Sequence, residues 1–106
     1  MTVRRVWRGW TSAKNADAYQ HVLLSQVIPM IKAKQMPEFR SIEVLREDLG
    51  EEVEFSTIMT FDTLEGVKAF MGEDYAQCHV PQIARDVLTR WDDEARHYQQ
   101  IDLIKP

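Results

Sequence analysis

The side chains best suited to proton transfer near neutral pH are three histidines, at positions 21, 79 and 97. His21 falls on the polar side of a predicted helix, which indicates a surface role. His79 follows Cys78 in a predicted loop, and His97 precedes Tyr98 in a predicted strand. Since adjacent strand residues point to opposite faces, His97 and Tyr98 cannot serve one pocket together. We take His97 or His79 as the candidate base or orienting group, and an ordinary loop or seam position as the competing interpretation of each.

Tyrosine hydroxyls and aromatic rings supply the other groups that an aromatic ligand requires. Tyr75 or Tyr98 is the candidate hydrogen-bond donor, and Trp7 and Phe70 are the candidate walls of a pocket. The candidate substrate-contacting residues are Trp7, Arg8, Phe55 and Phe70. Aromatic residues also dominate small cores, so plain packing is the competing interpretation for each ring.

Metal and cofactor chemistry have no local signal in the sequence. The three histidines show no ligand spacing, and the four glycines never fall in a phosphate-binding pattern. A G-x-S-x-G motif for acyl transfer is absent. Cys78, the single cysteine, has no evident base to generate a thiolate. We therefore expect no cofactor and no metal.

Composition predicts an ordinary globular domain spanning residues 1–106. Thirteen Lys and Arg against seventeen Asp and Glu give a net charge of −4, which argues against nucleic acid and membrane surfaces as partners. No apolar run approaches the ~18 residues of a membrane helix, and no signal-peptide pattern opens the chain. One cysteine excludes an intrachain disulfide, so we expect a reduced, cytoplasmic protein.

The elements that must position these side chains follow from the hydrophobic pattern. In chain order we predict a strand at Val3–Trp10, a helix from Ala16 that is disturbed at Pro29 and ends by Lys34, strands at Phe39–Leu49 and Glu51–Phe61, a helix capped by Asp62 and ended by Gly72, a helix from Pro81 to Trp91, and a strand at Ala95–Ile104. The order β-α-β-β-α-(α)-β is the α+β, ferredoxin-like arrangement, with a four-stranded antiparallel sheet and helices on one face.

Two features predict association. The apolar positions of the first helix fill an arc of roughly 240°, wider than one covering surface needs. Both faces of the hairpin carry apolar residues, with Val53, Phe55, Met59 and Phe61 on one face and Ile42, Val44 and Ile58 on the opposite one. We therefore expect a two-fold homodimer through the sheet faces. Opposite charges crowd the first strand (Arg4, Arg5, Arg8) and the hairpin (Glu47 to Glu54); solvated charge is one interpretation, and pairing across the dimer is the other.

Several segments, read together, resemble one family. They are RVWRGW in the first strand, NADAY in the first helix, VEFSTIMTFDTLEGVKAF, GEDY, and RHY in the last strand. The chain resembles the antibiotic-biosynthesis-monooxygenase-like proteins of the dimeric α/β-barrel superfamily. The resemblance implies that two four-stranded sheets face each other across a dimer, and that each subunit keeps a cleft between sheet and helices.

The resemblance also implies a function. Our first hypothesis is an oxidoreductase similar to the cofactor-independent monooxygenases, which binds a small aromatic or polycyclic substrate in the cleft. The alternatives are a non-catalytic barrel that binds a small ligand and an isomerase or lyase of a carbonyl compound. Haem-degrading members place a histidine near the position of His79, an asparagine on the first strand and a tryptophan on the second helix. Here the first strand offers Trp7 or Arg8 in place of the asparagine, and Phe70 stands in place of the tryptophan. These differences disfavour haem degradation.

Overall fold

The structure is a computed structural model that describes the whole chain, Met1–Pro106. Its strands are β1 (Val3–Ser12), β2 (Phe39–Asp48), β3 (Glu52–Phe61), β4 (Arg90–Trp91) and β5 (Arg96–Gln99), and its helices are α1 (Ala16–Val22), α2 (Ile28–Lys32), α3 (Leu64–Met71) and α4 (Gln82–Arg85). A 3-10 turn, η1 (Ala13–Asn15), precedes α1, and a π-helical turn, η2 (Leu23–Val27), joins α1 to α2. None of the helices has the length and apolarity that crossing a bilayer requires.

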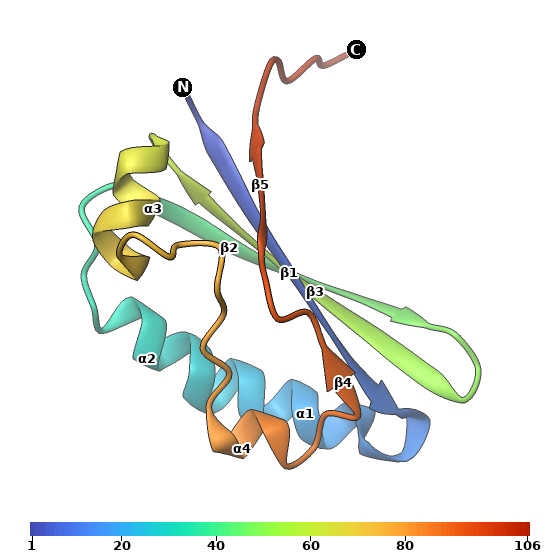
Figure 1. Ribbon diagram of the computed structural model, residues 1–106. Coiled ribbons are helices and arrows are strands. Elements are labelled where there is room, and N and C mark those ends of the chain that lie inside the picture. The colour runs from blue at the N-terminus through green and yellow to red at the C-terminus, as the bar shows by residue number, and fades with distance from the viewer.

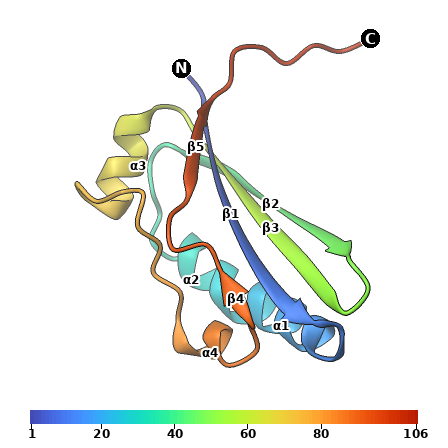
Figure 2. The same ribbon diagram turned by 45° about the vertical axis from the view of Figure 1, so that its right-hand side comes forward.

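The strands form one antiparallel sheet in the order β2-β3-β1, with β4 and β5 both paired to the free edge of β1 (Figure 1). Two views show the helices on the same side of this sheet, while no helix covers its other face (Figures 1 and 2). We call the uncovered side the open face. The α+β, ferredoxin-like architecture predicted from the sequence is confirmed.

The fourth strand position differs from the prediction, because two short strands fill it instead of one long strand. β5 ends at Gln99, where its partner β1 begins: the Gln100 N–H donates to the Thr2 carbonyl (2.8 Å), and β1 offers no further residue to pair with. β4 pairs with the other end of β1, at Gly9 and Trp10. The predicted strand over Ala95–Ile104 is therefore too long.

The first helical segment runs from α1 through η2 into α2 and crosses the covered face of the sheet (Figure 1). Its disturbance lies just before Pro29, as the missing proline N–H requires. In η2 the Ile28 N–H donates to the Leu23 carbonyl, five residues back, and the wider turn accommodates the proline.

The ends of the second predicted helix show one correct prediction and one error. Gly72, with a φ of 84°, ends α3 as expected. The cap is Thr63 and not Asp62, because the Thr63 Oγ1 accepts from the Gly66 N–H (3.2 Å) while Asp62 pairs with Arg40.

The third predicted helix is much shorter than its hydrophobic spacing suggested. α4 ends at Arg85, and a turn follows. Both the N–H and the hydroxyl of Thr89 donate to the Trp10 carbonyl (2.8 and 3.0 Å), which draws the chain to the edge of β1. Trp91 consequently lies in β4 and not in a helix, because backbone pairing with β1 replaces the last helical turns.

The faces of the hairpin confirm the alternation of β3 and correct the assignment of β2. Alternate β3 residues from Val53 to Phe61 are buried against the helices. Ile42 pairs with Met59 and Val44 with Thr57. Directly opposed residues share a face, so Ile42 and Val44 also lie under the helices. The prediction that they share a face with Ile58 was wrong, because Ile58 pairs with Glu43 on the open face.

The open face is consequently more polar than predicted, and two of its arginines are paired within the chain. Arg4 lies 3.6 Å from Glu43, and the Arg8 Nε donates to Asp92 (3.0 Å). Arg5 points the other way, into the interior. Two of the three arginines of the first strand therefore meet their acidic partners without a second subunit.

Candidate functional site

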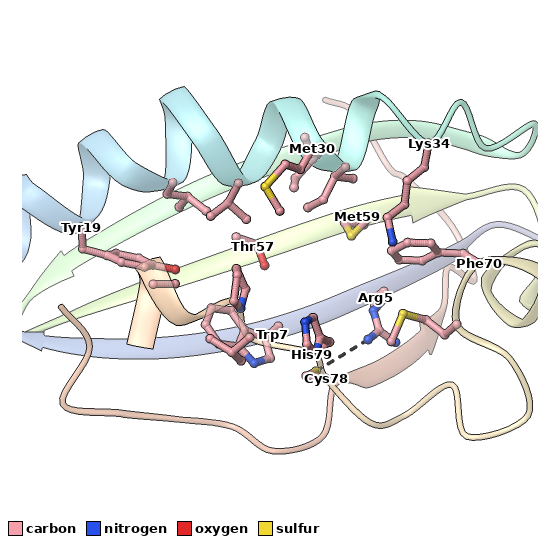
Figure 3. Close-up of a pocket in the computed structure, with 18 residues that line it drawn as sticks. Arg5, Trp7, Tyr19, Met30, Lys34, Thr57, Met59, Phe70, Cys78 and His79 are labelled. Carbon is pink, nitrogen blue, oxygen red and sulfur yellow. Dashed lines mark hydrogen bonds between the residues drawn. The ribbon is translucent and has the colours of Figure 1, made fainter. Parts of the chain in front are cut away.

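A cavity of about 190 Å³ lies between the sheet and the helices (Figure 3). Thirteen of its eighteen lining residues are hydrophobic. β1, β2 and β3 form its floor, the segment from α1 to α2 forms its roof, and α3 with the loop that leads into α4 closes its side. The cavity corresponds to the cleft that the resemblance implied.

Trp7 forms part of the floor, and two contacts hold its indole ring. The indole N–H donates to the Asp92 carbonyl (2.8 Å). The ring lies along β1 over Gly9, where an added Cβ would stand only 2.8 Å from Trp7 Cη2. The ring can occupy this place only because residue 9 has no side chain.

Tyr19 marks one end of the cavity, and its hydroxyl points toward the centre (Figure 3). Burial raises the pKa of Tyr19, so the hydroxyl stays protonated at every physiological pH. Phe55 supports the tyrosine ring from below in an edge-on contact, with ring centroids 4.9 Å apart. Thr57 adds a second hydroxyl to the floor.

Phe70 and Lys34 mark the opposite end (Figure 3). Phe70 stacks on the buried Phe61, with centroids 6.3 Å apart, and the Lys34 Nζ lies 4.8 Å from the centre of the Phe70 ring. Such a contact couples the ammonium to the face of the ring.

His79 lies on the loop between α3 and α4, where it lines the cavity and is also exposed to solvent. An imidazole in this position can exchange protons with bulk water. Of the three histidines, His79 alone borders the cavity.

Arg5 is buried in the floor, with 6% of its surface exposed. Its Nη1 donates to the Tyr75 carbonyl (2.5 Å) and to the His97 Nε2 (2.8 Å). Its Nη2 makes two longer contacts, to the Gln77 carbonyl (3.5 Å) and to the Cys78 Sγ (3.6 Å). The guanidinium thereby holds the loop after α3 against β1 and β5.

His97 and Cys78 stay uncharged beside this guanidinium. Burial, helped by the Arg5 charge, lowers the pKa of His97 from 6.5 to about 4. Because its Nε2 accepts a bond from Arg5, His97 is neutral at pH 7 with its proton on Nδ1. Burial raises the pKa of the Cys78 thiol despite the attraction of Arg5. The thiol is therefore protonated at neutral pH, which fits the interpretation of Cys78 as unreactive.

The structure brings together three of the residues singled out in the sequence, since Trp7, Phe70 and His79 all line the cavity. Neither His97 nor Tyr75 lines it. His97 lies behind Arg5, and Tyr75 packs edge-on against the His97 ring, with centroids 5.0 Å apart.

Three further candidates lie outside the cavity. Tyr98 is half exposed, and it pairs with Arg4 on the side of β5 opposite to His97. Arg8 binds Asp92, and its guanidinium lies 5.1 Å from the Trp10 ring. Phe55 is fully buried behind Tyr19.

Sequence reasoning missed Arg5, Tyr19 and Lys34 as members of the site. Strand alternation did place Arg5 on the same face as Trp7, and this was the available signal. Tyr19 was counted only as one apolar position among several on its helix. Lys34 stands where the helix was predicted to end, after its last apolar position, so nothing local tied it to a cavity.

No three His, Cys, Asp or Glu side chains gather in a group that could hold a metal ion. Haem does not fit the cavity either. An apolar cavity of about 150 Å³ holds one benzene ring, and a porphyrin is several times larger than that ring.

Comparison with known proteins places this geometry among solved folds. No family model matches the sequence, and no curated protein matches it. A Bacillus cereus protein assigned provisionally to the antibiotic biosynthesis monooxygenases superposes with a TM-score of 0.70 over 99% of this chain and 98% of that one. The chain therefore has the same fold as that protein. Sequence identity to that protein is 9%.

Two further structures extend the likeness. One, from Chloroflexus aurantiacus, carries the same provisional assignment and gives a TM-score of 0.58 at 14% identity, covering 99% of this chain and 98% of that one. The other is an ethyl tert-butyl ether d (EthD) family protein from Bacillus halodurans, with a TM-score of 0.58 at 16% identity, covering 95% and 100%. Both likenesses support the ferredoxin-like fold of this chain.

Proposed function

We propose that this chain is a monooxygenase that oxidises a small aromatic substrate with O₂ inside the cavity. The observation that carries the proposal is the composition of the lining, in which apolar and aromatic walls surround one histidine, His79, and one buried cation, Arg5. An apolar enclosure keeps water from a reactive carbanion. The likeness in fold to proteins assigned as monooxygenases supports the same reaction class.

The volume limits the substrate to a ring system of modest size. A cavity of about 190 Å³ is little larger than the roughly 150 Å³ that accommodates benzene. We therefore propose a single substituted ring, lying between Trp7 and Phe70, in place of a polycyclic substrate.

The reaction can be written with the substrate as the only electron donor. A phenol in its keto form carries a CH₂ group, and His79 accepts one of its protons. The resulting carbanion attacks O₂, so that a C–O bond forms; the O–O bond then breaks. One oxygen atom remains as a new carbonyl, and the other leaves as water with the two hydrogens of the CH₂ group. The carbon loses four electrons, which balances the reduction of O₂.

Three side chains have distinct parts in this scheme. His79 takes the proton, and its exposure lets the proton pass to solvent. Arg5 stabilises the negative charge on the substrate oxygen while the carbanion exists. The neutral Tyr19 hydroxyl, at the other end of the cavity, donates a hydrogen bond to the substrate.

Oxygen uptake tests the proposal directly, with one-ring quinols as substrates and the tricyclic anthrone for comparison. We expect uptake with the quinols, and with ¹⁸O₂ one labelled oxygen atom in the organic product. His79→Gln should lower turnover by about 10²–10⁴-fold, the usual contribution of a positioned base. His21→Gln, an exposed histidine outside the cavity, is the matched control and should leave turnover unchanged.

Two results would contradict the proposal. Quinols that bind without oxygen uptake would favour the ligand-binding alternative. Uptake that yields hydrogen peroxide and no labelled product would show a simple oxidase reaction and not a monooxygenase.

A further inference from the structure

Arg5 is a buried cation without an acidic partner. None of the ion pairs in the chain includes it, and its contacts are two backbone carbonyls, a histidine nitrogen and a thiol. A buried charge is ordinarily paired, because removing it from water is costly. All four of its contacts use Nη1 and Nη2, so that Nε is left without a bond. The guanidinium therefore retains one N–H donor, at Nε, that the chain does not satisfy, and its Nη2 donors are held only by the two long contacts of 3.5 and 3.6 Å.

The groups around Arg5 do not neutralise it. The low pKa of His97 and the raised pKa of Cys78 leave both side chains uncharged at pH 7. The cluster therefore keeps a full positive charge at the floor of the cavity.

The rest of the cavity lining adds positive charge and no negative charge. Arg5 and Lys34 are its only charged residues, and no aspartate or glutamate lines the cavity. This composition contrasts with the net charge of −4 for the chain. Figure 3 places both cations at the end marked by Phe70, while Tyr19 and apolar side chains occupy the other end. The cavity is thus cationic at one end and apolar at the other.

We propose that the ligand of this cavity is an aromatic ring that carries an anionic oxygen, a carboxylate or a phenolate, and that Arg5 binds this oxygen. The inference deepens the proposed function and rests on it, because it names the class of substrate for the same cavity. Charge-assisted bonds from a guanidinium are among the strongest that a binding site forms. Lys34, at the same end, adds a second positive charge, and the ring lies toward Tyr19.

Binding of two nearly isosteric probes tests the inference without any turnover. Benzoate and benzamide have the same ring, but only benzoate is charged at pH 7. Calorimetric titration should give an affinity for benzoate at least tenfold above that for benzamide. Arg5→Met should weaken benzoate binding by about 10- to 100-fold, as loss of a charged hydrogen bond predicts, and should leave benzamide binding unchanged.

The neighbouring arginine supplies a matched control. Arg4 adjoins Arg5 on β1 but faces the open side, where it pairs with Glu43. Arg4→Met should leave the affinities of both probes unchanged. The visible absorbance of 4-nitrophenol then separates phenolate from carboxylate recognition. Binding to the wild type should lower the pKa of this phenol, whereas binding to Arg5→Met should not.

Each outcome decides between the two proposals. Equal affinity for benzoate and benzamide in the wild type overturns the anionic subsite, while the aromatic cavity stands. Failure of both probes to bind overturns the cavity as a ligand site and, with it, the proposed function. If Arg5→Met does not fold, Lys34→Met takes its place, since Lys34 is exposed and makes no ion pair within the chain. Unchanged benzoate affinity in that variant would also count against the anionic subsite.

Discussion

Gly9 lets the Trp7 ring lie against β1, and substitution of this glycine tests whether the cavity floor is rigid. The Cβ of Gly9→Ala would lie 2.8 Å from Trp7 Cη2 and 3.1 Å from Leu88 Cδ2. Carbon atoms in favourable contact are about 3.5 Å apart or more. The indole ring must therefore move by about 0.7 Å, the difference between 3.5 and 2.8 Å. This movement also strains the hydrogen bond from the indole N–H to Asp92.

The energetic cost follows from two opposing effects. Overpacking of a core typically costs about 1–3 kcal/mol. Alanine also lowers the conformational entropy of the unfolded chain, which offsets roughly 0.4–1 kcal/mol of this cost. We expect a net loss of about 1–2 kcal/mol in the free energy of unfolding, measured by urea denaturation followed by circular dichroism.

A double-mutant cycle attributes this loss to the Trp7 ring. In a Trp7→Leu background the clash partner is absent, so Gly9→Ala should cost at least about 0.5 kcal/mol less. Gly50→Ala is the control: Gly50 has a φ of 95° and no atom within 4 Å of an added Cβ, so its cost is backbone strain alone and should be the same in both backgrounds. If Gly9→Ala lowers the free energy of unfolding as much in the Trp7→Leu background as in the wild type, the clash with the indole ring is not the cause of the loss.

Three other predictions concern stability and assembly. Burial and a neighbouring guanidinium lower the pKa of His97 from 6.5 to about 4, so between these values the unfolded chain binds a proton that the folded chain does not. The free energy of unfolding should thus fall as the pH falls through this window, by about 1–2 kcal/mol after allowance for solvent screening. His97→Gln should remove that part of the dependence of unfolding free energy on pH. Identical pH dependence in the variant and the wild type would refute the prediction. Thr63→Ala should cost about 1 kcal/mol in urea denaturation through loss of the helix cap, and Asp62→Ala, which breaks an exposed ion pair, should cost less; the reverse order would restore Asp62 as the cap. We also propose a homodimer that joins two open faces, with Leu45 and Tyr98, the exposed apolar residues of that face, in the interface. Sedimentation should give twice the 12.4 kDa chain mass, and serine at both positions should weaken the dimer, whereas a 12.4 kDa particle at micromolar concentration would exclude the barrel.

The fold was largely predictable because its signals are local. Strict alternation over β3 placed alternate residues from Val53 to Phe61 on one face, which the helices bury in the structure, and Gly72 marked a helix end. The local pattern could not show that distant backbone groups would take the hydrogen bonds of a segment with helical spacing. Residues after Arg85 have helical spacing, yet Thr89 bonds to Trp10, almost eighty positions earlier in the chain. The length of β5 likewise depends on where its partner begins.

The site was less predictable, since its key groups depend on what folds over them. In the sequence, Arg5 is one of several arginines on a charged strand. In the structure it is buried, because the loop after α3 covers it and supplies the carbonyls of Tyr75 and Gln77 as acceptors. His97 was chosen for its chemistry, but its basic nitrogen is already occupied by Arg5. Trp7, Phe70 and His79 do line the cavity because alternation, helix spacing and loop position locate them without long-range information.

The π-helical turn η2 carries one more residue than an α-helix would need to span the same length. Because one turn of a π-helix takes more residues than one turn of an α-helix, the extra residue is absorbed within η2, and α2 keeps the face that an uninterrupted helix would show to the cavity. A chain of the same fold with a single-residue deletion in this turn would regain a regular α-helix, with the same α2 side chains over the cavity. Insertions and deletions of one residue at this place can therefore accumulate among relatives without changing the cavity lining, and sequence alignments should shift by one residue here.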